Sequence, residues 1–302
     1  MFINSSGFSG TIAVLYLIFT TLVWGFSYSL TGEFLSGHVD SWFSAMFRLL
    51  LAALMFLPFL RWRGYRISTL LLYMLAGALQ LGVSYVLGFQ AYMYLSVADF
   101  LLFTVVTPLY ITLIYDLMCG RGVRLNYVCS ALLAMLGAAI INYNKAGDYF
   151  WHGFLLVQLG EFFLALGMVG YKRLQEVCPM EQHMAFSWFY LGAALVATIS
   201  WVIWGKADQA PSNASQWGVL LWLGMVATGL GYFMWNYGAT RVDCGTLCIM
   251  NSMHVPVGLL VNLAIWQQRP EWISFSLGSA LIFFSLWVHE RWIVNRVESP
   301  QT

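Results

Sequence analysis

The sequence has few charged residues. Asp, Glu, Lys and Arg make up only 9% of its 302 residues, whereas hydrophobic residues make up 60%. Soluble domains carry about 25% charged residues, so this deficit excludes an ordinary domain with a surface that faces water. The formal net charge is +1 and no basic stripe is present, which argues against a nucleic-acid-binding protein.

Cysteine and long polar stretches are also scarce. The five cysteines form no C-x-x-C pair and are expected to be small apolar packing residues. No metal-ligand spacing, phosphate-binding loop or nucleophile–base set stands out, so we predict no enzyme activity, no cofactor and no metal site. Residues 1–10 contain no Lys or Arg, which favours a retained first helix over a cleaved signal peptide.

The sequence is rich in apolar runs of membrane-spanning length. A helix needs about 20 apolar residues to cross a bilayer, whereas the strands of a β-barrel alternate apolar and polar residues. The runs are continuous, so we predict an all-α integral membrane protein with ten transmembrane helices. The predicted helices are 11–30, 42–60, 69–88, 97–118, 125–142, 152–171, 184–204, 217–236, 245–266 and 273–290.

The basic residues predict the orientation of these helices. Lys and Arg are enriched in the cytoplasmic loops of membrane proteins. If both termini are cytoplasmic, ten basic residues fall on the inner side, and three, Lys145, Lys206 and Arg269, fall on the outer side. An even number of helices agrees with this placement.

Two similar segments predict an internal repeat. Phe89–Tyr94 precedes Pro108, and Met234–Ala239 precedes Pro256, with offsets of 145 residues at the first element and 148 at the proline. Five helices per copy would invert the second copy in the membrane, and transporters of this design bind substrate between the copies. The two predicted five-helix repeats are residues 1–146 and 147–302.

Three residues are candidates for gating. Pro108 and Pro256 occupy matched positions in the two copies, where proline frees a carbonyl and permits a kink. A packing kink is the alternative interpretation for each. Lys172 lies near a predicted inner helix end, where it is either solvated or the positive charge of an inner gate.

Several segments carry a family resemblance. Trp24–Ser27 and the short turns before the fourth and ninth helices resemble the EamA-like branch of the drug/metabolite transporter superfamily, and longer segments resemble its bacterial biotin transporters. Those longer segments are Gly37–Ser41, Leu102–Thr104, Thr107–Asp116, Gly167–Leu174, Gly231–Thr240, Met253–Pro256 and Gly258–Trp266. The resemblance implies a secondary carrier that takes up biotin across the bacterial inner membrane by alternating access, with proton coupling as a further expectation. Its expected partners are a small-molecule substrate and the lipid bilayer, and we expect a monomer.

Two charged residues inside predicted spans are candidates for function. A charge in the hydrocarbon costs about 2.5–3.5 kcal/mol on insertion scales, so it needs a partner, water or a role. Arg48 can bind the carboxylate of biotin in bidentate geometry, form an internal salt bridge, or reach the interface. Glu161 is either a proton-coupling carboxyl group or the ion-pair partner of Arg48.

Other candidates would bind the remainder of the substrate. Asn251 and His254 are three residues apart and share a helix face, where they can bond the ureido ring of biotin or form a structural pair. Aromatic residues inside spans can pack against its apolar part. These residues are Trp24, Tyr28, Tyr85, Trp188, Tyr190 and Trp235.

Three alternatives to biotin uptake stay open at this point. An exporter of amino acids or other small metabolites is the alternative within the same class. An integral-membrane enzyme would need catalytic groups clustered at one interface. A membrane scaffold would not need matched polar groups in both repeats.

Overall fold

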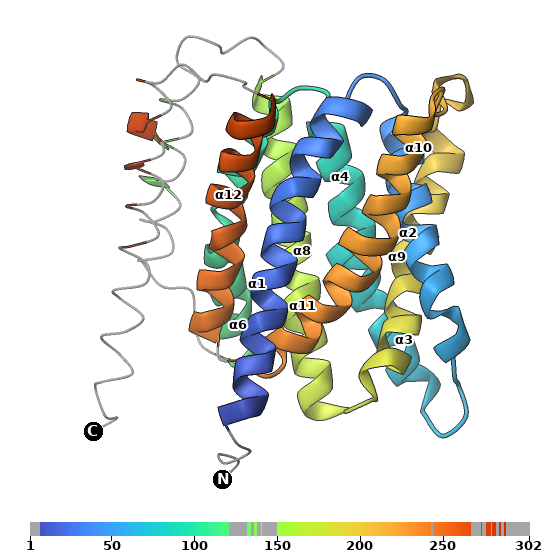
Figure 1. The fold of residues 1–302 in the computed structure, drawn as a ribbon. Helices are drawn as coiled ribbons and strands as arrows, with labels where there is room; N and C mark the ends of the chain where they lie inside the picture. The colour runs from blue at the N-terminus through green and yellow to red at the C-terminus, as the bar shows by residue number, and fades with distance from the viewer. Residues whose placement is uncertain are drawn as a thin grey trace.

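The computed structural model describes residues 7–120, 150–242 and 244–266, with scattered positions at 132–140 and 273–287. These residues form helices and contain no β-strand, as the continuous apolar runs predict. The helices stand side by side in one bundle (Figure 1). Most residues of the predicted spans at 125–142 and 273–290 lie outside the described residues.

Within the described residues, seven helical segments are long and apolar enough to cross a membrane, and they coincide with seven of the predicted spans. An eighth predicted span, 245–266, is also a helix. The helices are α1 (Gly7–Leu30), α2 (Ser41–Phe56), α3 (Ile67–Gly77), α4 (Ser84–Ala91), α5 (Val97–Thr104), α6 (Thr107–Met118), α8 (Phe150–Val177), α9 (Gln182–Trp204), α10 (Ala214–Leu221), α11 (Gly231–Ala239) and α12 (Cys244–Trp266).

Three π-helical segments interrupt the spans. Thr31–Leu35 extends α1, Ala78–Val83 joins α3 to α4, and Trp222–Leu230 joins α10 to α11. A π-helical turn disturbs the regular backbone hydrogen bonding of a helix, and such turns are frequent at functional sites. Uniform apolar runs carry no sign of these interruptions.

Side chains satisfy the carbonyl groups of the third π-helical segment. The indole Nε1 of Trp24 donates to the carbonyl oxygen of Ala227 at 2.9 Å. The hydroxyl of Tyr190 lies 2.7 Å from the carbonyl oxygen of Thr228. These contacts tie α1 and α9 to the segment between α10 and α11, and they hold Thr228 in a fixed position.

Of the two matched prolines, Pro108 and Pro256, one lies at a break in a helix. α5 ends at Thr104 and α6 begins at Thr107, with Pro108 in its first turn. In contrast, α12 continues without interruption across Pro256, whose side chain lies outside the described residues. A proline in each copy is expected to permit a kink; the helix is interrupted at Pro108, and α12 shows no interruption at Pro256.

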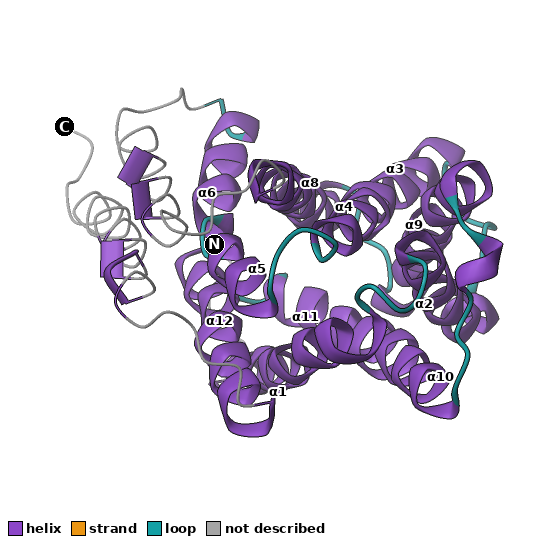
Figure 2. Cartoon of the chain, turned by 90° about the horizontal axis from the view of Figure 1, so that it is seen from above, coloured by secondary structure: helices purple, strands orange, loops and turns teal. Residues whose placement is uncertain are grey.

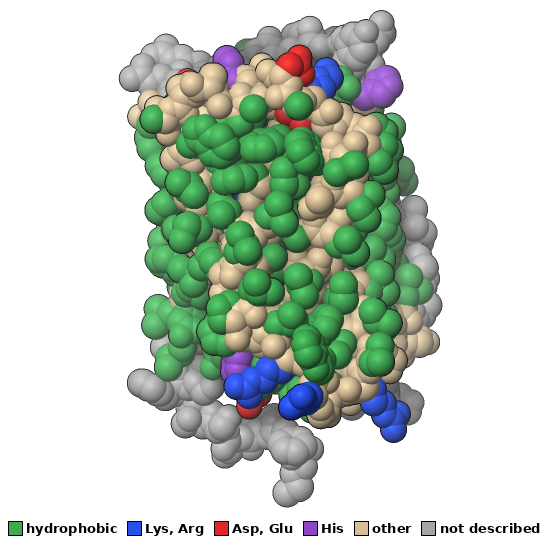
Figure 3. Space-filling view, turned by 90° about the vertical axis from the view of Figure 1, so that its right-hand side faces the viewer, with side chains coloured by type: hydrophobic (Ala, Val, Ile, Leu, Met, Phe, Trp, Pro, Cys, Tyr) green, Lys and Arg blue, Asp and Glu red, His purple; other side chains and the backbone are tan. Residues whose placement is uncertain are grey.

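The outward faces of the bundle are apolar. Leu54, Leu155 and Val202 are 59%, 62% and 71% exposed. Figure 3 shows hydrophobic side chains over the middle of one face and charged side chains near its two ends. Such a surface is costly in water, so it matches a protein surrounded by lipid.

We call the end at which α1, α3 and α9 begin the lower end, and the opposite end the upper end, as in Figure 1. Most described basic residues lie near the lower end, which the predicted orientation places in the cytoplasm. The lower-end basic residues are Arg61, Arg63, Arg66, Lys172, Arg173 and Arg241, whereas Lys206 follows α9 at the upper end.

Two glycines allow α3 and α9 to pack backbone to backbone. A Cβ atom on Gly77 would lie 1.8 Å from the carbonyl oxygen of Phe189. A Cβ atom on Gly192 would lie 1.9 Å from the carbonyl oxygen of Met74. A side chain at either position would therefore push the two helices apart, as expected for small residues at membrane helix crossings.

The helices surround a central space. Seen from above, α1 and α11 lie on one side of it and α4 and α8 on the other (Figure 2). α1 packs against α11 and α12, and α4 packs against α8. Side chains from these elements determine what fills the middle of the bundle at each depth.

Candidate substrate site

A cavity occupies the upper half of the central space. The empty space within it, counted together with open solvent at its mouth, is about 610 Å³. Most lining residues of α1, α2, α4 and α8 come from the half of each span nearer the upper end, whereas Leu164 of α8 and Tyr232 of α11 lie in the lower halves of their spans. The wall is mainly aromatic, and its aromatic residues are Trp24, Tyr28, Tyr85, Phe89, Tyr92, Phe100 and Tyr232.

Arg48 provides a positive charge in this wall. Its Nε donates to the hydroxyl of Thr228 at 2.6 Å, and its Nη2 donates to the hydroxyl of Tyr85 at 3.1 Å. The guanidinium carbon lies 4.5 Å from the centre of the Tyr85 ring, a cation–π contact. No carboxylate of the described residues lies within 4.0 Å, so Arg48 keeps N–H groups for an anionic ligand.

Glu161 provides a carboxyl group in the same wall. Its side chain is 9% exposed, and the hydroxyl of Thr107 lies 2.5 Å from its Oε2. Glu161 and Arg48 both line the cavity but form no ion pair with each other. The alternative of a structural pair between these two residues is therefore wrong for this conformation.

Tyr92 has an unsatisfied hydroxyl group at the cavity. Its side chain is 7% exposed, and its Oη has no hydrogen-bond partner among the described residues. The ring stacks on Phe100 with 4.3 Å between the ring centres, which fixes its direction. Burying a hydroxyl group without a partner is unfavourable, so Tyr92 is a natural contact for a polar group of a ligand.

The predicted aromatic residues divide into two groups. Trp24, Tyr28 and Tyr85 line the cavity, as predicted. Trp188 does not, because it lies near the lower end and its Nε1 donates to the carbonyl of Arg61 at 3.0 Å. Trp235 is fully buried against Trp24 with 4.9 Å between the ring centres, so it lies behind the wall. Tyr190 is likewise buried away from it.

Asn251 and His254 lie behind the cavity wall. The two residues are buried together on α12, and Nδ1 of His254 contacts the carbonyl oxygen of Asn251. Nε2 of His254 lies 3.0 Å from the hydroxyl of Thr104, and its ring packs on Tyr28 in a tilted arrangement with 5.5 Å between the ring centres. Neither residue lines the cavity, so the prediction of a direct substrate contact is not supported by their placement.

The lower half contains hydrogen bonds that join the two halves of the sequence. Gln80 and Asn236 bond each other through their amide groups, at 3.1 and 3.3 Å. Lys172 donates to the carbonyl oxygens of Ala239 and Val242, at 2.9 and 3.0 Å. Lys172 therefore lies at the lower ends of the helices, as predicted, and caps the end of α11.

Sequence reasoning missed several polar residues at the cavity, among them Tyr92 in its wall and Thr107 and Thr228, which contact Glu161 and Arg48. Each is a hydroxyl-bearing residue in an otherwise apolar helix, where nothing in the local pattern distinguishes it. The orphan hydroxyl of Tyr92 and the contacts of the two threonines become visible only in three dimensions. Within the described part of the chain, no group of three or more His, Cys, Asp or Glu residues could hold a metal ion. Cys119 and Cys178 are free thiols there, and the other three cysteine side chains lie outside it.

This arrangement defines a class. Apolar helices surround a cavity near mid-bundle with a few placed polar groups, as in membrane carriers. The sequence profile of the EamA-like transporter family matches residues 11–143 and 151–289, so the chain belongs to that family. It is a transporter rather than an enzyme, and a multi-pass protein of the bacterial inner membrane.

Full-length relatives are similar to this chain. It is 61% identical over 286 residues to a protein from Salmonella typhimurium named "Biotin transporter", covering 95% of each chain. An Escherichia coli protein of the same name gives the same values. A "Probable biotin transporter" from Pseudomonas aeruginosa is 48% identical over 276 residues, covering 91% of this chain and 96% of that protein.

A solved structure shares the fold. It is titled "Crystal structure of protein" and has a TM-score of 0.65 to this chain, covering 91% of this chain and 96% of its own. Its sequence identity is 18%, so the likeness shows the fold alone.

Proposed function

We propose that this protein takes up biotin across the inner membrane as a secondary carrier that works by alternating access. Relatives at 61% and 48% identity over nearly the whole chain are named for biotin. The observation that carries the proposal from the structure is the guanidinium of Arg48, which faces an aromatic cavity without a carboxylate partner among the described residues. Biotin has one carboxylate on an apolar chain, which complements this cavity.

The proposed architecture is two inverted five-helix repeats, residues 1–146 and 147–302, with ten helices and both termini in the cytoplasm. The similar segments around Pro108 and Pro256 support it, as does the number of basic residues at the lower end. In this orientation the cavity lies in the outer half of the membrane. The structure is then an outward-facing state, which receives biotin from outside the cell.

Arg48 is the proposed carboxylate-binding residue. Its bonds to Thr228 and Tyr85 fix the plane of the guanidinium. A planar guanidinium binds a carboxylate through two parallel hydrogen bonds, and it stays charged at any working pH. Because Thr228 belongs to the segment between α10 and α11, Arg48 joins the substrate to both halves of the sequence.

The remainder of biotin would contact the aromatic wall. Trp24, Tyr28 and Tyr85 offer apolar faces to the sulfur-containing ring and the aliphatic chain. The hydroxyl of Tyr92 is a donor that can reach the ureido carbonyl. Asn251 and His254 act indirectly in this arrangement, since His254 supports the ring of Tyr28.

Glu161 is the proposed coupling residue. A carboxyl group that exchanges a proton in the cavity can link the movement of a proton to the movement of the biotin anion. Thr107, the residue before Pro108, contacts Glu161. The helix break at Pro108 is therefore in position to respond to the charge of Glu161. Lys172 and Pro256 are the other proposed gating residues.

Complementation tests the substrate. We expect the chain to restore growth, at low external biotin, to a bacterial strain that lacks both biotin synthesis and biotin uptake. The same cells should accumulate radiolabelled biotin in a saturable manner. An absence of saturable uptake above the empty-vector control would contradict the proposal. Resistance to an amino-acid analogue with no gain for the auxotroph would instead indicate export of small metabolites.

A further inference from the structure

The break between α5 and α6 leaves a carbonyl group for side chains to satisfy. Pro108 has no N–H, so it cannot donate to the carbonyl oxygen of Thr104 four residues earlier. The hydroxyl of Thr107 lies 2.5 Å from that oxygen and takes the place of the missing donor. At the same break, Nε2 of Gln158 donates to the carbonyl of Phe103 at 3.1 Å.

The hydroxyl of Thr107 also contacts Glu161, but it has only one proton and cannot donate to both partners. Its Oγ1 lies 2.5 Å from Oε2 of Glu161 as well as 2.5 Å from the oxygen of Thr104. A hydroxyl group has one proton, and a backbone carbonyl can only accept. If Thr107 donates to Thr104, the contact with Glu161 holds a hydrogen bond only when the carboxyl group carries the proton.

The opposite assignment is less favourable. An ionised Glu161 would accept the proton of Thr107 and leave the carbonyl of Thr104 without a donor among the described residues. Thr104 and Thr107 are both fully buried, so an unsatisfied carbonyl there carries the full cost of removing it from water.

The neighbouring groups do not supply a close positive charge to an ionised Glu161. On the α12 side, His254 contacts the carbonyl oxygen of Asn251 and the hydroxyl of Thr104, and neither of its ring nitrogens lies within 4.0 Å of the Glu161 carboxyl group. Arg48 lines the same cavity and forms no ion pair with Glu161. The other titratable groups in the cavity wall are Tyr28, Tyr85, Tyr92 and Tyr232, and Tyr110 lies nearby, bonded to Gln158 of α8.

We propose that Thr107, placed by the break at Pro108, holds the proton on Glu161 in the substrate-free state. Thr107 is thus a positioning residue that acts through Glu161. When Glu161 ionises, its proton passes to water in the cavity, and no other covalent bond changes. This inference deepens the proposed function, because it names the residue that sets the pH range over which a proton-coupled carrier would work.

The first test detects the proton on Glu161 and does not depend on transport. Infrared spectra of the purified, biotin-free protein should contain the C=O stretching band of a protonated carboxyl group at neutral pH, and this band should be absent in Glu161→Gln. In Thr107→Val the band should disappear at a lower pH than in the wild type, by on the order of one pH unit, because one hydrogen bond to the protonated form is lost. Thr107→Ser keeps the hydroxyl and should titrate like the wild type.

The second test measures biotin uptake against pH in the same variants. The pH dependence of uptake should shift in Thr107→Val in the same direction as the infrared band, and Thr107→Ser should restore the wild-type profile. If Thr107→Val does not yield folded protein, Thr107→Ala replaces it, and the comparison of wild type with Glu161→Gln still tests for the proton.

The results distinguish this inference from the proposed function. An absence of a Glu161 carboxyl band at neutral pH would overturn the inference, as would identical titration in Thr107→Val and wild type. If the band behaves as expected but no biotin is transported, the proposed function fails and the role of Thr107 stands.

Discussion

The upper and lower halves of the bundle are built from the same helices and differ in how their polar groups are satisfied. In the upper half, the polar groups of Arg48 and Tyr92 face a cavity with unused hydrogen-bonding capacity. In the lower half, Gln80 and Asn236 bond each other, and Lys172 bonds backbone carbonyls. Both halves are polar inside, and buried polar atoms without a partner also occur away from the cavity, at Trp235 and Asn251, so the candidate substrate site is marked by polar groups that line a cavity.

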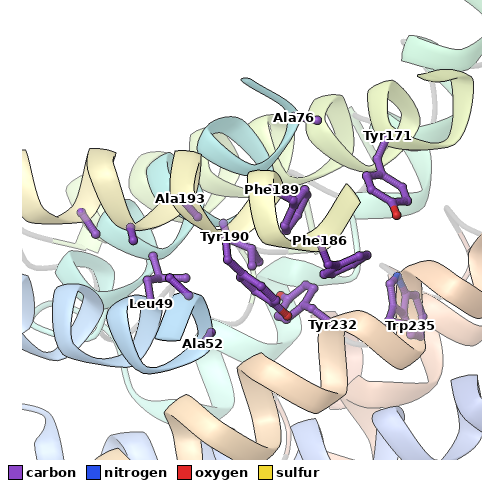
Figure 4. Close-up of a cluster of buried hydrophobic side chains, with 14 of the residues drawn as sticks. Leu49, Ala52, Ala76, Tyr171, Phe186, Phe189, Tyr190, Ala193, Tyr232 and Trp235 are labelled. Carbon is purple, nitrogen blue, oxygen red and sulfur yellow. The ribbon is translucent and has the colours of Figure 1, made fainter. Parts of the chain in front are cut away.

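Aromatic residues show the same contrast. In the lower half they fill the space between helices, and Figure 4 shows Tyr171, Phe186, Phe189 and Tyr190 packed together. In the upper half, aromatic rings surround a space that a small molecule can occupy. The upper half therefore contains a cavity, and the lower half is packed. A carrier that works by alternating access needs this kind of asymmetry in each of its states.

The largest expected effect is at Arg48. Replacing it in Arg48→Ala removes the charge that binds the carboxylate, and uptake should fall by about 10- to 100-fold at unchanged expression. Radiolabelled biotin uptake measures the loss. Arg173→Ala is the matched control in the lower half, because Arg173 is exposed and pairs with Glu176 on the surface. Full activity of Arg48→Ala would remove Arg48 from the mechanism.

The next effect concerns accumulation rather than binding. A gradient of one pH unit stores about 1.4 kcal/mol per proton, enough for about tenfold accumulation of biotin in proteoliposomes if one proton moves with each anion. Glu161→Gln should equilibrate biotin across the membrane without concentrating it. Accumulation by this variant equal to that of the wild type would show that coupling lies elsewhere.

A smaller effect is expected at Tyr92. Tyr92→Phe keeps the ring and removes one neutral hydrogen bond to the substrate, so KM should rise by about 2- to 10-fold with little change in kcat. Tyr73→Phe is the matched change in the lower half, where the hydroxyl of Tyr73 donates to the carbonyl of Cys178. It should lower thermal stability and leave KM unchanged. A raised KM in Tyr73→Phe together with an unchanged KM in Tyr92→Phe would contradict the division between the two halves.

The smallest effect is expected at the amide pair of the lower half. Asn236→Leu breaks its bonds to Gln80, and membrane interhelical bonds average about 0.6 kcal/mol. The variant should unfold at a slightly lower temperature and spend more time with the lower half open. A single cysteine introduced beside the pair should react faster with a water-soluble maleimide. Unchanged labelling would mean that this pair does not hold the lower half closed.

Much of the fold is predictable from the sequence because the bilayer imposes a simple length and polarity rule. The seven described spans were expected from continuous apolar runs. The π-helical segments were not, because hydrogen-bond slippage leaves no mark on hydropathy. The interruption at Pro108 was expected from chemistry, whereas Pro256 shows that a membrane helix can also continue through proline.

The site was predictable only in part. Arg48 and Glu161 stand out because a charge in a span is costly, and both line the cavity. Aromatic and amide residues carry no such signal, since a span that is apolar on all sides does not reveal which face is buried. Trp188 and Trp235 therefore lie away from the cavity, and Tyr92 and Thr107 were missed.

The central claim is that Arg48 binds the carboxylate of biotin. The most direct measurement compares the binding of biotin with that of its neutral amide, in purified wild-type protein and in Arg48→Gln. We expect the wild type to prefer biotin by on the order of 10- to 100-fold, and Arg48→Gln to bind the two molecules about equally. The same preference for biotin in both proteins would contradict the claim.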